Sequence, residues 1–108
     1  GTVVVFGGEA EVTACSSKGQ TTVAGVISTN PAYLMNSDLD GGVEVAIMGR
    51  VPCKVIGKVR KGDMLVTSAI PGYAIVNNSP GVGTVLGKAI GTKDSDERGI
   101  VEIAVGKV

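Results

Sequence analysis

The chain contains no histidine and no tryptophan, and its only aromatic residues are Phe6, Tyr33 and Tyr73. Histidine is the most common general base and zinc ligand, because its unperturbed pKa lies near neutrality. Its absence argues against most hydrolytic mechanisms, and the scarcity of aromatic rings leaves no surface on which bases or sugars stack. We therefore expect no catalytic residues, no metal site and no cofactor.

Charge of one sign is not in excess either, since 10 Lys and Arg residues balance 10 Asp and Glu residues. Proteins that bind nucleic acid need a surplus of basic side chains on one face to contact phosphates. No segment approaches the roughly 18 apolar residues of a membrane span, and the apolar start at residues 3–6 lacks the basic flank of a signal peptide. We expect neither a nucleic-acid partner nor membrane insertion.

Cysteine is scarce, with Cys15 and Cys53 as its only members. The two thiols form no CxxC motif, and each lies in a Val-rich run where cysteine usually serves as a small buried hydrophobic residue. We predict that both are buried and free.

What the chain does have is many more Val and Ile residues than Leu, together with 17 Gly. This composition favours short strands and tight turns. At 108 residues, 44% of them hydrophobic, the chain is long enough for one core, so we predict a single all-β domain over residues 1–108.

Segments bounded by Gly, Pro, Asn or Asp predict nine strands, at residues 2–6, 11–15, 22–28, 43–48, 53–56, 64–67, 73–76, 84–90 and 100–105. Closure into a small barrel or two packed sheets removes the exposed edges that such strands would otherwise leave. At most one short helix is expected, near residues 30–35, where Asn30 is a predicted N-cap and Pro31 takes the first helical position.

The chain also resembles itself. Residues 43–51 match residues 101–108, residues 1–5 match 62–66, and residues 23–27 match 86–90, in the same order in both halves. We predict a pseudo-twofold duplication with repeats at about residues 1–51 and 57–108. The alternative is that Val-rich strands resemble one another through composition alone.

Four segments carry residues with chemical potential, and each has a plainer interpretation that we favour. The basic stretch 54–63 is interpreted as the solvated face of a hairpin with a turn at its end, rather than a polyanion site. The acidic stretch 93–99 is interpreted as a polar hairpin loop, because it lacks the length and the terminal ligand of a calcium loop. The glycines at 7–8 and 81–83 lie between predicted strands, where they serve as turns rather than as a phosphate-binding motif.

The fourth segment, residues 36–42, places Ser37 beside Asp38 and Asp40. A hydroxyl next to carboxylates is compatible with backbone self-cleavage, with a lysine as the base. We favour a Gly-rich connection stabilised by Asx-type turns.

One family resemblance extends over essentially the whole chain. Its specific parts are the STNPAY block within residues 25–37 and the GRVP block within residues 49–55, and it continues through residues 61–68, 71–74, 86–89 and 101–106. With these blocks the chain resembles the C-terminal domain of tail-fibre and related virion structural proteins of tailed phages. In such proteins a longer chain precedes the domain, so the resemblance implies that Gly1 begins a C-terminal fragment.

The resemblance implies a non-enzymatic structural or assembly domain of a virion appendage, built in the host cytoplasm and working as a homo-oligomer, with a trimer favoured. Its implied partners are the upstream shaft and other virion proteins. Two alternatives stay open. One is an autoproteolytic intramolecular chaperone that promotes fibre trimerisation, although its catalytic residues have no match here position by position. The other is a module that binds a host receptor or glycan.

Overall fold

The structure is a computed structural model that describes residues 1–7, 12–28 and 45–106. In this part of the chain there are nine strands and no helix, so the predicted all-β class is confirmed. The strands are β1 (Val3–Phe6), β2 (Val12–Ala14), β3 (Val23–Ile27), β4 (Val45–Ala46), β5 (Gly49–Ile56), β6 (Met64–Thr67), β7 (Ala74–Val76), β8 (Val85–Ala89) and β9 (Arg98–Val105). The helix expected near residues 30–35 lies outside the described residues.

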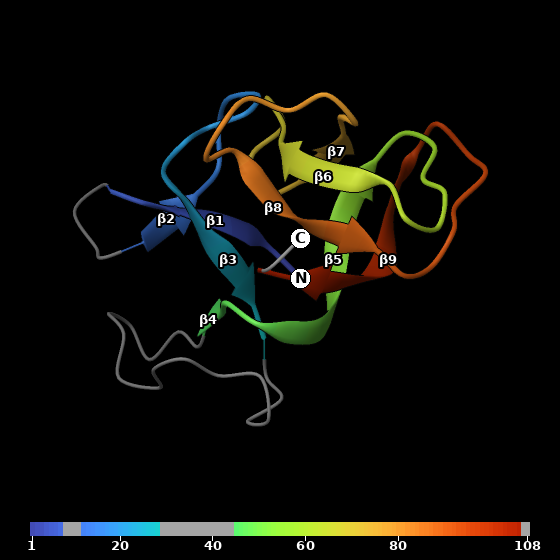
Figure 1. The fold of residues 1–108 in the computed structure, drawn as a ribbon, viewed down its shortest axis with the longest axis horizontal. Coiled ribbons are helices and arrows are strands. Elements are labelled where there is room, and N and C mark those ends of the chain that lie inside the picture. The colour runs from blue at the N-terminus through green and yellow to red at the C-terminus, as the bar shows by residue number, and fades with distance from the viewer. Residues whose placement is uncertain (8–11, 29–44, 107–108) are drawn as a thin grey trace.

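The strands form two packed sheets (Figure 1). The first has the order β2-β1-β3-β4, and the second closes into a barrel in the order β5-β7-β6-β8-β9. All pairs are antiparallel except β5 with β7, which pair in parallel at Val55 and Ala74. The parallel pair is what closes the barrel, because it joins the two ends of the β7-β6-β8-β9-β5 series.

Strand β5 differs most from its prediction. The strand begins at Gly49, four residues before the expected start at Cys53. Proline usually interrupts a sheet because it has no N–H to donate. Here Pro52 pairs with Glu102 of β9, whereas β7 pairs with β5 only at Val55. The Lys54 N–H points away from β9, because it donates to the Gly1 carbonyl, and N–H groups two residues apart on a strand point to the same side. The nitrogen of Pro52 therefore also faces away from β9, so the missing N–H costs no hydrogen bond of the β5–β9 ladder.

One aliphatic core joins the two sheets. Buried side chains from the first sheet, such as Val3 and Val26, belong to the same cluster as Val51, Leu65 and Ile103 from the second. Strand alternation places these residues on inward faces while their neighbours point outward, as the pattern along β5 shows. The two sheets therefore form a single packed unit.

Backbone hydrogen bonds reinforce this packing at the start of β1. The Val3 N–H donates to the Gly72 carbonyl at 2.8 Å, and the Gly72 N–H donates to the Cys15 carbonyl at 3.1 Å. The Lys54 N–H donates to the Gly1 carbonyl at 2.9 Å. These bonds tie the first strand to both β5 and the turn before β7.

The two halves of the chain pair their strands in the same way. In the first half β1 lies between β2 and β3, and Val4 pairs with both Ala14 and Gly25. In the second half β6 lies between β7 and β8, and the residues that correspond to these three are Leu65, Val76 and Gly87. The register shifts directly after Val4 in one half and directly after Leu65 in the other. The two bulges thus occupy corresponding positions in the two halves, a detail that composition does not dictate.

The same registers correct one part of the sequence alignment. The sequence alignment pairs residues 23–27 with residues 86–90. In the structure, residues 23–27 correspond to residues 85–89, so that Gly25 corresponds to Gly87. A Cβ atom at Gly25 would collide with the Ala46 carbonyl oxygen, and one at Gly87 would collide with the Ala104 carbonyl oxygen. The close approach of a neighbouring strand is thus the property that the two positions share.

Candidate functional site

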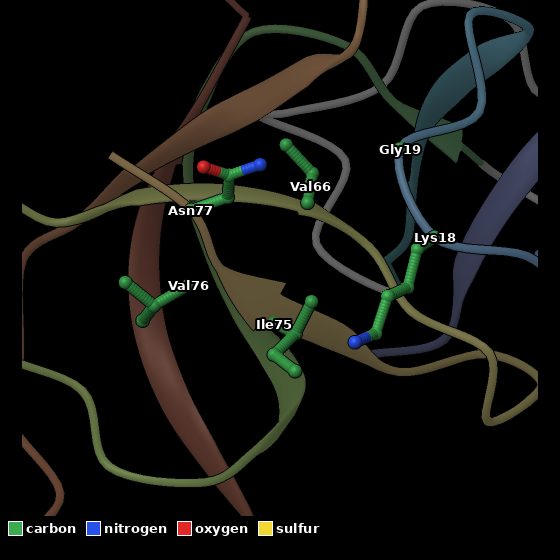
Figure 2. A pocket seen from close by; sticks show the side chains of 6 residues that line it. All are labelled: Lys18, Gly19, Val66, Ile75, Val76 and Asn77. Atoms are coloured by element: carbon green, nitrogen blue, oxygen red, sulfur yellow. The ribbon is translucent and has the colours of Figure 1, made fainter. Parts of the chain in front are cut away.

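One cavity in the described part of the chain lies between the turn that follows β2 and the outer side of β6 and β7. Its volume is about 320 Å³. Figure 2 shows the lining residues, which are Lys18, Gly19, Val66, Ile75, Val76 and Asn77. In that view the side chains of Lys18 and Asn77 stand on opposite sides, with aliphatic side chains between them. The cavity is therefore an aliphatic hollow with one cation and one amide at its rim.

Hydrogen bonds hold the wall of this cavity in place. The Gln20 side-chain Oε1 accepts from the Ser16 N–H at 2.9 Å, which closes the turn. The Gln20 N–H donates to Thr67 Oγ1 at 2.7 Å, and Thr67 Oγ1 donates to the Ser17 carbonyl at 2.6 Å. Gly19 adopts the left-handed region, with φ of 59°, and its N–H donates to the Thr67 carbonyl. The turn is thus fixed to β6 by one buried threonine.

The lining residues combine one ionisable side chain, Lys18, with one amide, Asn77. A lysine ammonium and an asparagine amide can orient a ligand. Proton transfer in this cavity would rest on Lys18 alone, because none of the other five lining residues carries a carboxylate, thiol or hydroxyl. Throughout the described ranges, no cluster of three Cys, Asp or Glu side chains has the geometry to hold a metal ion.

The basic stretch 54–63 does not form the predicted hairpin. Strand β5 ends at Ile56 and β6 begins at Met64, and the two strands are not neighbours in the barrel. The stretch instead crosses between separated strands and is anchored by Val59, which is fully buried and bridges to Lys93. The predicted turn does form, because the Asp63 carboxylate accepts from the Arg60 N–H at 2.8 Å and Gly62 takes a φ of 92°.

The acidic stretch 93–99 joins β8 to β9, which pair directly, so the predicted hairpin loop is correct. Its lysine is engaged rather than free. Lys93 Nζ donates to the Gly57 carbonyl at 2.7 Å and to the Ser95 carbonyl at 2.6 Å. The loop is therefore attached to the crossing segment by its own cation.

Both cysteines are buried and free, as predicted. The thiol of Cys15 lies 3.4 Å from the Tyr73 carbonyl oxygen, which accepts its hydrogen bond. Burial raises the pKa of the Cys53 thiol to about 12, because desolvation disfavours the thiolate. Since the thiolate is the reactive form, Cys53 is inert in the folded protein.

The remaining predicted segments are only partly described. Residues 36–42, with Ser37 and Asp38, lie outside the described residues, as does Gly8. Gly83 takes a φ of 77° in the segment between β7 and β8, as its predicted turn role requires.

The sequence analysis did not identify one group of residues that meet on the outside of the barrel, namely Lys54, Tyr73 and Arg98. Lys54 Nζ lies 5.9 Å from the centre of the Tyr73 ring, and Arg98 Cζ lies 5.3 Å from it. The only available signal was the alternation along β5 and β9, which places Lys54 and Arg98 outside the barrel. The position of the ring depends on the parallel pairing of β5 with β7, which no local pattern indicates.

Comparison of the chain with protein-family models, with curated proteins and with solved structures finds no match. In the described part of the chain, no helix is long and apolar enough to span a membrane.

Proposed function

We propose that this domain is a non-enzymatic structural and assembly module of a tailed-phage virion appendage, such as a tail fibre, and that it acts through packing and association between copies. The family resemblance of the STNPAY and GRVP blocks suggests this class. The folded domain supplies a stable unit for such a role, because one aliphatic core joins both sheets.

The proposal rests on one observation, which is that the buried hydroxyl side chains donate hydrogen bonds to backbone carbonyls of nearby segments. Ser68 Oγ donates to the Tyr73 carbonyl at 2.6 Å, Thr84 Oγ1 donates to the Gly81 carbonyl at 2.7 Å, and Thr67 links two segments as described above. Among the described residues, no buried side-chain nitrogen or oxygen lacks a partner. These groups hold turns in place, which is what a rigid scaffold requires.

Association between copies is tested by sedimentation equilibrium of the 108-residue chain. A mass of three chains that persists on dilution supports the proposal. A monomer at all concentrations up to about 100 μM overturns it, because obligate assembly proteins associate well below that range.

Mass spectrometry of the same chain separates this role from the self-cleaving chaperone. The structural role predicts an intact chain, and it predicts that Ser37→Ala and Asp38→Asn leave the mass and assembly unchanged. A wild-type chain cut near residues 36–40, with the cut abolished by either substitution, favours the chaperone instead.

A further inference from the structure

A cation pair on the outside of the barrel shares one aromatic ring. Lys54 comes from β5, Arg98 from the start of β9, and Tyr73 precedes β7. The barrel order places β5 between β7 and β9, so the three residues lie across adjacent strands. We call Lys54, Tyr73 and Arg98 the basic–aromatic cluster.

The cluster faces away from the core. Cys53 and Val55 are fully buried, so the alternation of β5 directs Lys54 to the opposite side. On β9 the same argument places Ile100 outward, because Val101 is buried. Ile100 pairs with Lys54 in the sheet and is 66% exposed. An exposed aliphatic side chain therefore lies directly beside the two cations.

The two cations are held in place without an anion from the described residues. Lys54 Nζ donates to Thr2 Oγ1 at 3.0 Å, and its remaining contact is with the ring. Arg98 contacts the ring, and no described carboxylate pairs with it. The negative face of an aromatic ring attracts each cation, but two like charges near one ring also repel each other. Both cations also carry N–H donors that a ring face does not satisfy, and a carboxylate that accepts from either cation would reduce that repulsion.

We propose that the basic–aromatic cluster binds a carboxylate of an acidic peptide segment, with an aliphatic neighbour of that carboxylate packed on Ile100. Arginine presents a planar fork that matches a carboxylate, and the lysine adds a point charge beside it. The exposed Ile100 gives this site an apolar surface that a bare phosphate would leave unused.

A nucleic acid fits these observations less well. Phosphate backbones are bound through many basic contacts, and the whole chain has no net charge. Single-stranded bases need a free aromatic face, whereas Tyr73 already holds two cations against its ring. The assignment does not depend on the assembly role proposed above, because a monomeric domain would hold the same peptide.

The test is an NMR titration of the folded domain with a blocked Asp-Leu-Glu tripeptide and with its uncharged Asn-Leu-Gln counterpart. The acidic peptide is expected to produce saturable shifts centred on Lys54, Tyr73, Arg98 and Ile100. The amide peptide should bind about tenfold more weakly or worse, as the loss of charge-assisted hydrogen bonds implies. Equal binding of the two peptides overturns the proposal.

Substitutions locate the site. Lys54→Gln and Arg98→Gln should each weaken binding of the acidic peptide about fivefold to tenfold. The control is Lys88→Gln on β8, which removes the same charge from an exposed lysine and should bind as the wild type does. An equal loss in the Lys88 variant shows that net charge alone drives the binding, and it overturns the site.

Two further probes identify the source of the anion. Inorganic phosphate and a thymidine oligonucleotide are titrated in the same way, and each is expected to bind more weakly than the acidic peptide. Tighter binding of either one overturns the peptide assignment. Ile100→Ser should weaken the peptide and leave phosphate unchanged, and its spectrum reports whether the variant is folded.

Discussion

At the scale of single residues, the fold depends on side chains that are small or absent where strands approach closely. Gly25 and Gly87 occupy corresponding positions in the two halves, and each faces a backbone carbonyl of the adjacent strand. Cys53 fills a fully buried position in β5. The two glycines are needed for the space that they leave, and Cys53 serves as a buried small side chain rather than as a reactive thiol.

Gly87→Ala is expected to lower the free energy of unfolding by about 2 kcal/mol or more, because the new methyl group meets the Ala104 carbonyl and the strands must separate. Urea denaturation measures the change. The matched control is Gly81→Ala, whose methyl group would lie 3.6 Å from Thr84 Cγ2, an ordinary contact. Its effect should stay within about 1 kcal/mol. Equal losses in both variants would contradict the close-approach argument.

The buried Cys53 thiol predicts a pH dependence of stability. Its pKa is raised from 9.0 to about 12, so the folded state retains the proton while the unfolded chain releases it. The contribution to stability is therefore complete below about pH 9 and is lost as the pH rises toward 12. Relative to Cys53→Ala, the free energy of unfolding should fall by up to about 1.4 kcal/mol per pH unit in this range.

Urea denaturation of both proteins between about pH 8 and pH 11 measures this difference. The variant corrects for every other ionisable group, since it differs from the wild type only at residue 53. Parallel stability curves for the two proteins would show that the Cys53 thiol ionises as readily in the folded state as in the unfolded chain.

At the scale of elements, the turn at residues 16–20 depends on a strand far away in the sequence. Its hydrogen bonds to Thr67 fix both the turn and the wall of the cavity that Lys18 and Asn77 line. Strand β5 is a second case, because Pro52 is tolerated at a position whose backbone nitrogen faces away from the paired strand β9. In both cases a local feature is explained by a partner from the other half of the chain.

Thr67→Val should destabilise the domain by about 1–3 kcal/mol, because it keeps the shape but leaves the Gln20 N–H and the Ser17 carbonyl without their partner. Thr67→Ser retains the hydroxyl, so it should lower the free energy of unfolding by less than Thr67→Val does. Hydrogen exchange provides a local readout: the Gln20 amide should exchange faster in the valine variant and at nearly the wild-type rate in the serine variant. Unchanged exchange at Gln20 in Thr67→Val would show that the bond does not hold the turn.

At the scale of the whole molecule, the two halves of the chain pair their strands alike but share one hydrophobic core. The strand registers repeat between the two halves, yet the main core cluster takes side chains from both, including Val3, Val26, Leu65 and Ile103. The barrel also closes only through pairs between β5 and strands further along the chain. The halves are therefore alike in pattern but dependent on each other for burial.

Fragments 1–56 and 57–108, which leave β5 intact, should each be unfolded alone, because separation exposes apolar surface that the intact domain buries. Proton NMR spectra of the separate fragments should show little dispersion, and mixing them should restore at least part of the native spectrum. The intact chain is the control. A well-dispersed spectrum from either fragment alone would show that a repeat folds as an independent domain.

The local sequence pattern determined the fold class and most of the strand positions of this protein. The nine strands appear where alternation, β-branching and turn residues predict them, since these signals act over a few residues. The free, buried cysteines also follow from composition and their apolar surroundings. The bounds of β5 did not follow, because the effect of a proline depends on which strands flank it.

Tertiary structure alone decided which strands meet. The parallel pairing of β5 with β7 closes the barrel and brings Tyr73 to Lys54 and Arg98, while Thr67 meets the turn at residues 16–20. The one-residue correction to the repeat likewise came from strand register, which set Gly25 against Gly87. Such contacts join residues about 20 to 50 positions apart, and the packing of the whole chain selects them rather than the preferences of any one segment.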